Sequence, residues 1–204
     1  MTVHSTGQVR CGRCGRPHAA ELYTSIDIST DPDLKEKVRD GSVFVSECPY
    51  CGSKCLSGGN LLYRDPAAKV MISLLPEGFP RERPEDPDGL FASWTTRLVR
   101  TPGELVEKIC ILDSGLEDTA IEMVKFVTAQ DLKGDPSGPM RFYRIEGADN
   151  DLVFTFPSGE EMKAVTVGFG VYEDCSAVFR RNEDLLPKGL FPEVNVEWID
   201  SMMK

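Results

Sequence analysis

The sequence predicts an α+β protein: an amino-terminal zinc ribbon packed with an antiparallel sheet and a helical hairpin, followed by a strand-rich carboxy-terminal half. Three observations lead to this class. Two C-x-x-C-G phrases begin at Cys11 and Cys48, short runs of alternating hydrophobicity flank them and return near the carboxyl end, and helical periodicity is concentrated in residues 101–131.

The amino-terminal third is predicted to be small antiparallel β structure. Residues 22–28 alternate apolar and polar side chains as a half-buried strand does, and residues 31–39 follow with an Asp-Pro helix-start signal. Gly41 ends that helix, and a β-rich run over 42–47 leads into Cys48. Two further strands are expected on either side of the turn signal R-D-P-A-A-K at 64–69.

A proline- and charge-rich stretch follows and is predicted to be an exposed loop or linker. It divides the chain into a zinc-ribbon β segment over 1–76, the loop over 77–92, and an α+β segment over 93–204 that contains the helical hairpin and the final strands. A single continuous domain is the alternative, because strand signals stand on both sides of the loop.

The helical hairpin is predicted from caps and spacing. A strand over 93–100 precedes Thr101, which caps a first helix with apolar residues at helical spacing. Asp113-Ser114-Gly115 ends this helix, and a second one runs over 117–131. The apolar residues expected to face the core are Leu105, Ile109, Leu112, Ile121, Val124, Phe126 and Val127.

The carboxy-terminal half is predicted to form three strands over 140–169, with turns near Asp149-Asn150 and Ser158-Gly159. The phrase G-F-G-V-Y at 168–172 matches no phosphate-loop pattern and is predicted to be a turn or bulge. Residues 193–203 are predicted to form a final strand that ends in a helical turn.

Composition places the chain among folded proteins and limits its partners. Of its 204 residues 41% are hydrophobic and 27% charged, with a net charge of −10. Residues 1–62 hold seven basic and seven acidic residues, so the rest of the chain carries the whole negative charge and disfavours generic nucleic-acid binding. With neither an apolar leader nor a membrane-length apolar run, we expect a cytoplasmic protein whose thiols stay reduced.

The paired cysteines predict a structural zinc site with Cys11, Cys14, Cys48 and Cys51 as ligands. Zinc binds four thiolates tetrahedrally, and a two-residue spacer lets one tight turn offer two sulfurs to the same ion. The glycine after each pair permits the positive φ of such a turn. A thioredoxin-like redox pair is the rival, but it needs a βαβ context that this sequence lacks.

The remaining cysteines and histidines are expected to lie outside the metal shell. Cys55 and His18 each follow a pair by four residues, yet four thiolates already close a tetrahedral site. Cys110 is expected to be a small buried hydrophobe and Cys175 a half-buried thiol. The roles of these three cysteines stay open at this stage.

Catalysis is not predicted. A closed four-sulfur site offers no position for water, and His4 and His18, the two histidines, both lie at the amino-terminal end. Acidic pairs such as Glu117-Asp118 and Glu160-Glu161 stand at helix starts and turns, where we expect solvated charges.

Several phrases together resemble the bacterial CpXC family. They are C-G-R-C-G, D-P-D-L-K-E-K-V-R-D-G-S-V-F-V-S-E-C-P-Y-C-G, L-L-Y-R-D-P-A-A-K and E-K-I-C-I-L-D-S-G-L-E-D-T-A-I-E, spread over residues 9–130. The resemblance implies a zinc-ribbon-like domain whose ligands fall on the same four cysteines, without an established activity. The family's C-P-x-C reads C-G-R-C at the first site, a change that removes no donor atom.

The function predicted is a zinc-binding module that binds or scaffolds a protein partner, without a membrane role. One alternative is nucleic-acid binding through Arg10, Arg13 and Arg16 around the first cysteine pair. Another is an enzyme with an acidic active site in a cleft between the helical hairpin and the carboxy-terminal strands.

Overall fold

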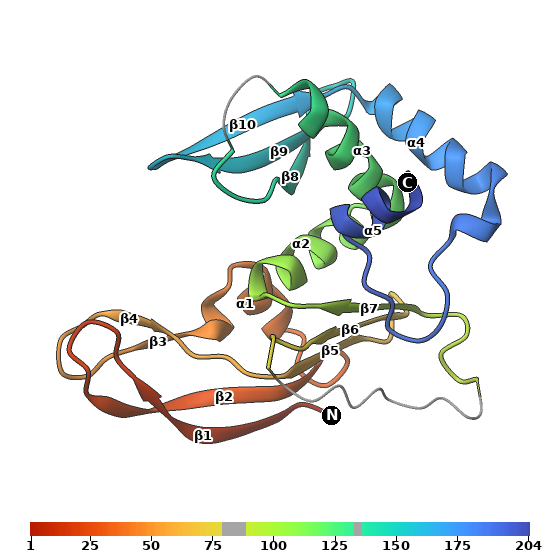
Figure 1. The fold of residues 1–204 in the computed structure, drawn as a ribbon. Coiled ribbons are helices and arrows are strands. Elements are labelled where there is room, and N and C mark those ends of the chain that lie inside the picture. The colour runs from red at the N-terminus through yellow and green to blue at the C-terminus, as the bar shows by residue number, and fades with distance from the viewer. Residues whose placement is uncertain (79–88, 133–135) are drawn as a thin grey trace. The chain divides into compact units, whose positions relative to one another are not determined.

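The computed structural model describes residues 1–78, 89–132 and 136–204 of the chain (Figure 1). They form two compact units, one of residues 1–106 with 189–192 and the other of residues 107–188 with 193–204. Most of the loop predicted over 77–92 falls on residues 79–88, which, like residues 133–135, lie outside the described residues.

The first unit contains a five-stranded sheet in the order β1-β2-β5-β6-β7. Its strands are β1 (Val3–Arg10), β2 (Pro17–Asp27), β5 (Leu61–Asp65), β6 (Val70–Leu74) and β7 (Thr95–Val99). The strands predicted around the 64–69 turn are β5 and β6. The sheet is mixed, because β2 pairs with β5 and β6 with β7 in parallel, whereas the other two pairings are antiparallel.

Strand β1 was not predicted, and its position explains why. It lies at the edge of the sheet, and most of its residues are exposed. An edge strand that is exposed to solvent on both faces does not need alternating apolar and polar residues, so its polar sequence does not indicate a strand. In β5 and β6, by contrast, every second residue or more is buried, which is the pattern that the sequence shows.

A second, two-stranded sheet pairs β3 (Val45–Glu47) with β4 (Lys54–Leu56). Helix α1 (Leu34–Arg39) and the 3-10 turn η1 (Ser42–Phe44) precede it. The helix begins three residues later than predicted, because the carbonyls of Asp31 and Pro32 accept N–H groups only three residues ahead, as in a turn. Gly41 ends this segment in the left-handed conformation, as predicted.

The buried Asp65 fixes the turn between β5 and β6. Its carboxylate accepts a hydrogen bond from the Ala68 N–H at 3.1 Å and from the Lys35 ammonium at 3.0 Å. The aspartate therefore closes the turn and ties it to α1, so both the turn phrase and the short helix belong to one packing unit.

Helix α2 (Pro102–Asp113) contains the boundary between the units, which falls after Val106. The Thr101 hydroxyl accepts the Glu104 N–H at 3.2 Å and donates to the Glu104 carboxylate at 3.0 Å. This reciprocal contact satisfies helix-start donors and confirms Thr101 as the cap.

The second unit combines a three-stranded antiparallel sheet with helices. The sheet has the order β10-β9-β8, from β8 (Arg141–Glu146), β9 (Asp151–Ser158) and β10 (Glu161–Val167). The helices are α3 (Asp118–Asp131), α4 (Phe169–Arg181) and α5 (Val196–Met202), with the 3-10 turn η2 (Glu183–Leu185) after α4. The three predicted strands are confirmed, and Asn150 and Gly159 take positive φ in their turns.

The predictions for the start of α4, for α5 and for Val127 were wrong. The phrase at 168–172 is the start of α4, whose buried residues follow at helical spacing: Tyr172, Cys175, Ser176 and Phe179. Residues 196–202 form α5 instead of a strand, capped by the Asn195 side chain at 2.8 Å from the Trp198 N–H. Val127 is exposed, because its face of α3 points away from the core that Ile121 and Val124 enter.

The largest departure from the sequence prediction is a chain of buried charges in the second unit. Lys108 of α2 lies 3.1 Å from Asp118 and 2.8 Å from Glu122, both on α3. Asp118 is therefore a buried ion-pair partner, and the prediction of a solvated charge was wrong. Burial alone would favour the neutral amine, but the Asp118 and Glu122 carboxylates raise the pKa of Lys108 above its ordinary value.

The same chain continues to strand β8. Lys125 lies 2.9 Å from Glu122 and 2.8 Å from Glu107. Glu107 also accepts the Arg141 guanidinium at 3.1 Å and the Phe142 N–H at 2.8 Å. Three acids thus alternate with three bases, so the network is formally neutral and connects α2, α3 and the edge strand β8 by directional contacts.

Candidate metal centre

The two cysteine pairs lie in loops of the same backbone conformation. In the first loop the Gly15 N–H donates to the Cys11 carbonyl at 2.9 Å, and in the second the Gly52 N–H donates to the Cys48 carbonyl at 2.9 Å. Both glycines take positive φ, 71° and 67°. We call these two loops, residues 11–16 and 48–53, the knuckles; their shared geometry confirms that the glycines serve a left-handed turn position.

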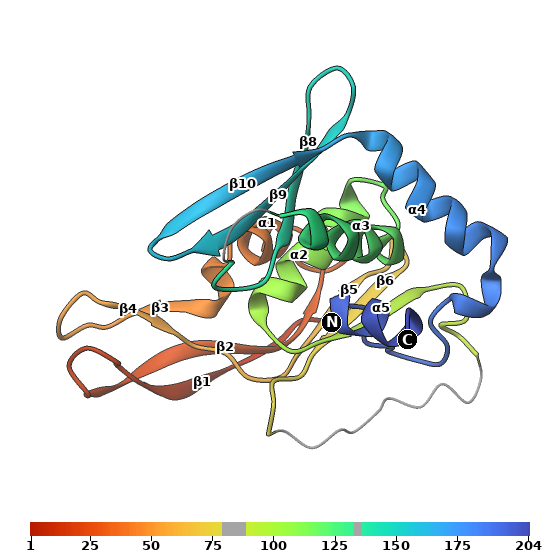
Figure 2. The same cartoon turned by 45° about the horizontal axis from the view of Figure 1, so that its top comes forward.

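Two hairpins carry the knuckles. The first knuckle joins β1 to β2, and the second joins β3 to β4, and two views of the ribbon show these hairpins side by side (Figures 1 and 2). The buried His18 of β2 lies between them, with Nε2 3.2 Å from the Ser46 hydroxyl of β3. His18 therefore helps to align the hairpins and stands outside the sulfur group.

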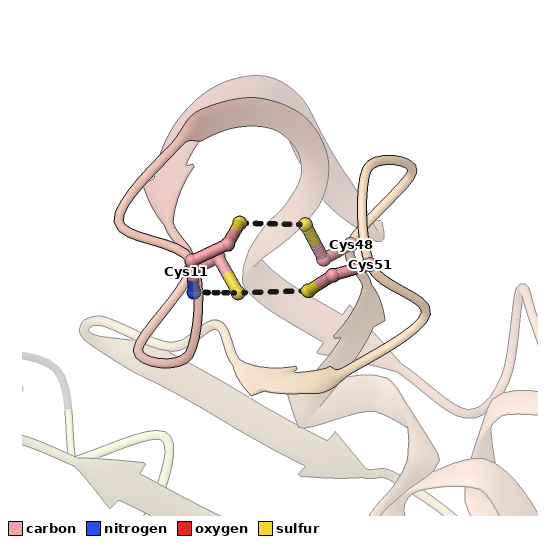
Figure 3. A group of neighbouring side chains, drawn as sticks. Cys11, Cys48 and Cys51 are labelled. Carbon is pink, nitrogen blue, oxygen red and sulfur yellow. Dashed lines mark hydrogen bonds between the residues drawn. The ribbon is translucent and has the colours of Figure 1, made fainter.

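The hairpins bring the four predicted ligand cysteines together. Their sulfur atoms all lie within 4.8 Å of one another (Figure 3). The Cys11 and Cys51 sulfurs are 3.7 Å apart, and so are those of Cys14 and Cys48. These separations rule out disulfides, whose sulfurs are about 2.05 Å apart.

The sulfur separations fit a tetrahedral metal shell. A tetrahedron with zinc–sulfur bonds of about 2.3 Å has edges of about 3.8 Å. The two 3.7 Å contacts each join one knuckle to the other, so one ion at the centre would cross-link both hairpins. In the part of the chain that the structure describes, this is the one group of three or more cysteine, histidine or acidic residues with metal-ligand spacing.

The electrostatics of the group also favour a cation. The Cys14 N–H points at the Cys11 sulfur from 3.5 Å, and such contacts lower the pKa of Cys11 to about 6. A hydrogen bond from the Ser53 N–H acts in the same direction on Cys51, but burial and the neighbouring thiols raise its pKa to about 12. Two thiolates 3.7 Å apart repel each other, so full ionisation of the group needs a cation among the sulfurs.

The other thiols occupy ordinary packing positions. Cys55 is buried against Cys11 and Cys48, 3.6 Å from the Ser53 carbonyl, but does not belong to the four-sulfur group. Cys110 is half-buried on α2. Cys175 is buried in α4, more deeply than predicted, and burial raises the pKa of its thiol to about 11.

A scan against protein families matches residues 9–125 of the chain to the family described as CpXC protein. The chain belongs to the CpXC family. No curated protein and no solved structure matches it. The CpXC match covers both knuckles and ends at Lys125. It therefore includes the five buried members of the charge network on α2 and α3, which are Glu107, Lys108, Asp118, Glu122 and Lys125. Arg141, the sixth member, lies beyond the matched residues.

The fold explains the two sequence phrases that mark this CpXC chain. The cysteine phrases form the knuckles. Four charged residues of E-K-I-C-I-L-D-S-G-L-E-D-T-A-I-E, namely Glu107, Lys108, Asp118 and Glu122, belong to the buried network, which Lys125 and Arg141 complete. Sequence reasoning found the first and missed the second. No described helix combines the length and apolar character needed to cross a membrane.

Proposed function

We propose that this CpXC protein is a zinc-binding module whose metal site is structural and whose task is to bind or scaffold a protein partner. The single observation that carries the metal assignment is the pair of 3.7 Å sulfur contacts between knuckles, which match the edges of a four-thiolate tetrahedron. Four thiolates prefer soft or borderline ions, and a regular tetrahedron suits zinc.

The structural role follows from the ligand count. Four cysteines fill all positions of a tetrahedral ion, which leaves no place for a water or substrate. The ion would hold the two hairpins together, and metal binding then contributes directly to folding free energy. A site of this type stabilises the surface around it, and that surface is available for recognition.

An acidic active site receives less support. A cavity of about 380 Å³ in the second unit is lined by the end of the helical hairpin and by α4. Glu173 is the one carboxylate among the residues described as lining it. Acid–base hydrolysis by paired carboxylates needs two acids with different pKa values, and the buried acids of this unit are engaged with lysines.

Metal content and partner capture test the proposal together. Purified protein should contain one zinc per chain by mass spectrometry of the metal. Cys14→Ser should lose it, whereas Cys55→Ser, which removes a neighbouring thiol outside the shell, should keep it. The zinc-loaded chain used as bait should retain a specific protein that the Cys14→Ser chain does not. Zinc loss in both variants, or no specific protein on the loaded bait, contradicts the proposal.

A further inference from the structure

The two knuckles present a cationic surface on an otherwise acidic protein. Residues 9–18 and 45–56 contain four basic residues and one acid, Glu47. The basic residues Arg10, Arg13, Arg16 and Lys54 are all exposed. Even with the −2 charge of four thiolates on a divalent ion, this end of the first unit stays positive, while the whole chain carries −10 before metal binding.

These four cations are not consumed by internal ion pairs. Among the described residues, none of them pairs with a carboxylate. Arg10 donates to the Gly15 carbonyl at 3.1 Å, which orients its guanidinium over the first knuckle. Other exposed or half-exposed arginines of the chain, such as Arg141 and Arg144, do have acidic partners. The knuckle cations therefore remain available to an external anion.

Exposed apolar side chains stand among the cations. Tyr50, between the two cysteines of the second knuckle, is 56% exposed, and the Arg16 guanidinium lies 5.1 Å from its ring centre. Leu56 is 81% exposed. It lies across from Val45 in the register of β3 and β4, on the face that also carries Lys54, whereas Cys55 points to the opposite, buried side.

From these observations we infer that the knuckle surface, made of Arg10, Arg13, Arg16, Tyr50, Lys54 and Leu56, binds a protein segment in which acidic residues alternate with apolar ones. Guanidinium groups pair with carboxylates in a fork geometry, and the partner's apolar side chains would cover Leu56 and Tyr50. The inference rests on the proposed function, since the metal holds the two halves of this surface together.

A nucleic acid fits the same surface less well. Tyr50 is the one aromatic residue among those that make up the knuckle surface, so successive bases have no second ring on which to stack. The exposed aliphatic Leu56 and Val45 offer nothing to phosphates. A long polyanion would also extend over a chain of net charge −10, which repels it more than it repels a short peptide segment.

Fluorescence anisotropy on the full-length, zinc-loaded chain tests the inference. The probes are a labelled 12-residue peptide of four Asp-Glu-Leu repeats, the same peptide with Asn and Gln in place of its acids, and a labelled 12-nucleotide thymidine strand. We expect binding of the acidic peptide alone, and weaker binding at higher salt. Arg13→Glu/Arg16→Glu should weaken binding by at least about tenfold.

A matched pair of substitutions controls for net charge. Arg181→Glu/Lys188→Glu makes the same charge change at exposed positions of the second unit and should alter peptide affinity by less than about twofold. Leu56→Asn should weaken the peptide complex without any change in net charge. Zinc is measured in every sample. A purified chain without metal contradicts the proposed function, whereas a zinc-loaded chain that does not bind the acidic peptide overturns this inference alone. Equal losses in the two charge-reversal pairs, or binding of the thymidine strand in preference to the peptide, also overturn it.

Discussion

Replacing Lys125 by methionine should destabilise the second unit severely. The Lys125 ammonium lies 2.8 Å from Glu107 and 2.9 Å from Glu122, and its side chain is 6% exposed. Methionine fills similar volume but leaves three carboxylates with two cations in the network. Breaking a buried pair in this way costs about 3–5 kcal/mol, because one charge stays buried and uncompensated.

Thermal and urea unfolding measure this effect. A loss of about 3–5 kcal/mol lowers the midpoint of thermal unfolding by roughly 6–20 °C for a chain of this size. Lys163→Met deletes an ammonium group that is exposed to solvent on β10, and it should cost less than about 0.5 kcal/mol in the free energy of unfolding.

A double substitution shows whether charge, and not packing, causes the loss. In Glu122→Gln/Lys125→Met, Lys108 keeps Asp118 at 3.1 Å and Glu107 keeps Arg141 at 3.1 Å, so the remaining network is neutral. The double variant should therefore be more stable than Lys125→Met alone. The electrostatic reasoning is wrong if Lys125→Met costs no more than Lys163→Met. It is also wrong if the loss of stability in the double variant equals the sum of the losses in Glu122→Gln and Lys125→Met alone.

Three further predictions concern the knuckles, a buried acid and a buried thiol. Gly52→Ala should cost about 1 kcal/mol in the free energy of unfolding, because residue 52 has a φ of 67°. Gly12→Ala should cost less, because residue 12 has an ordinary φ and a Cβ there meets open space. Equal losses in the two variants would contradict the role of the left-handed turn. Hydrogen bonds from the amino-terminal ammonium and from Ser29 lower the pKa of Asp27 to about 2. The contribution of Asp27 to stability should therefore be complete above pH ~4 and disappear as the pH falls toward 2. Asp27→Asn should flatten this part of the acid-unfolding curve, and an unchanged curve would refute the assignment. Burial raises the pKa of Cys175 to about 11, so at pH 8 this thiol should react with a thiol reagent much more slowly than the half-buried Cys110. Peptide mass mapping follows both reactions. Equal rates would contradict the prediction and show that α4 opens readily.

The features predictable from the sequence were those set by local chemistry. The knuckles depend on two-residue spacers and a following glycine, and the start of α2 depends on Thr101 and Glu104, three residues apart. Each signal is complete within a few residues. The strands on either side of the 64–69 turn were likewise predicted by a local turn phrase and alternating apolar residues.

The features that were missed depend on contacts distant in sequence or on local signals that point elsewhere. Asp118 and Glu122 look solvated until Lys108 and Lys125 are seen to meet them in the folded chain. Helix α4 carried a readable signal, since its buried residues recur every three or four positions from Tyr172, but the glycines at 168 and 170 favoured a turn. Helix propensity is a weak guide where tertiary packing decides.

X-ray absorption at the zinc edge of the purified protein tests the central claim most directly. The account predicts one zinc per chain surrounded by four sulfur atoms at about 2.3 Å, with no nitrogen or oxygen ligand. A shell that contains imidazole or water, or purified protein that holds no metal while all four knuckle thiols react freely, would contradict it.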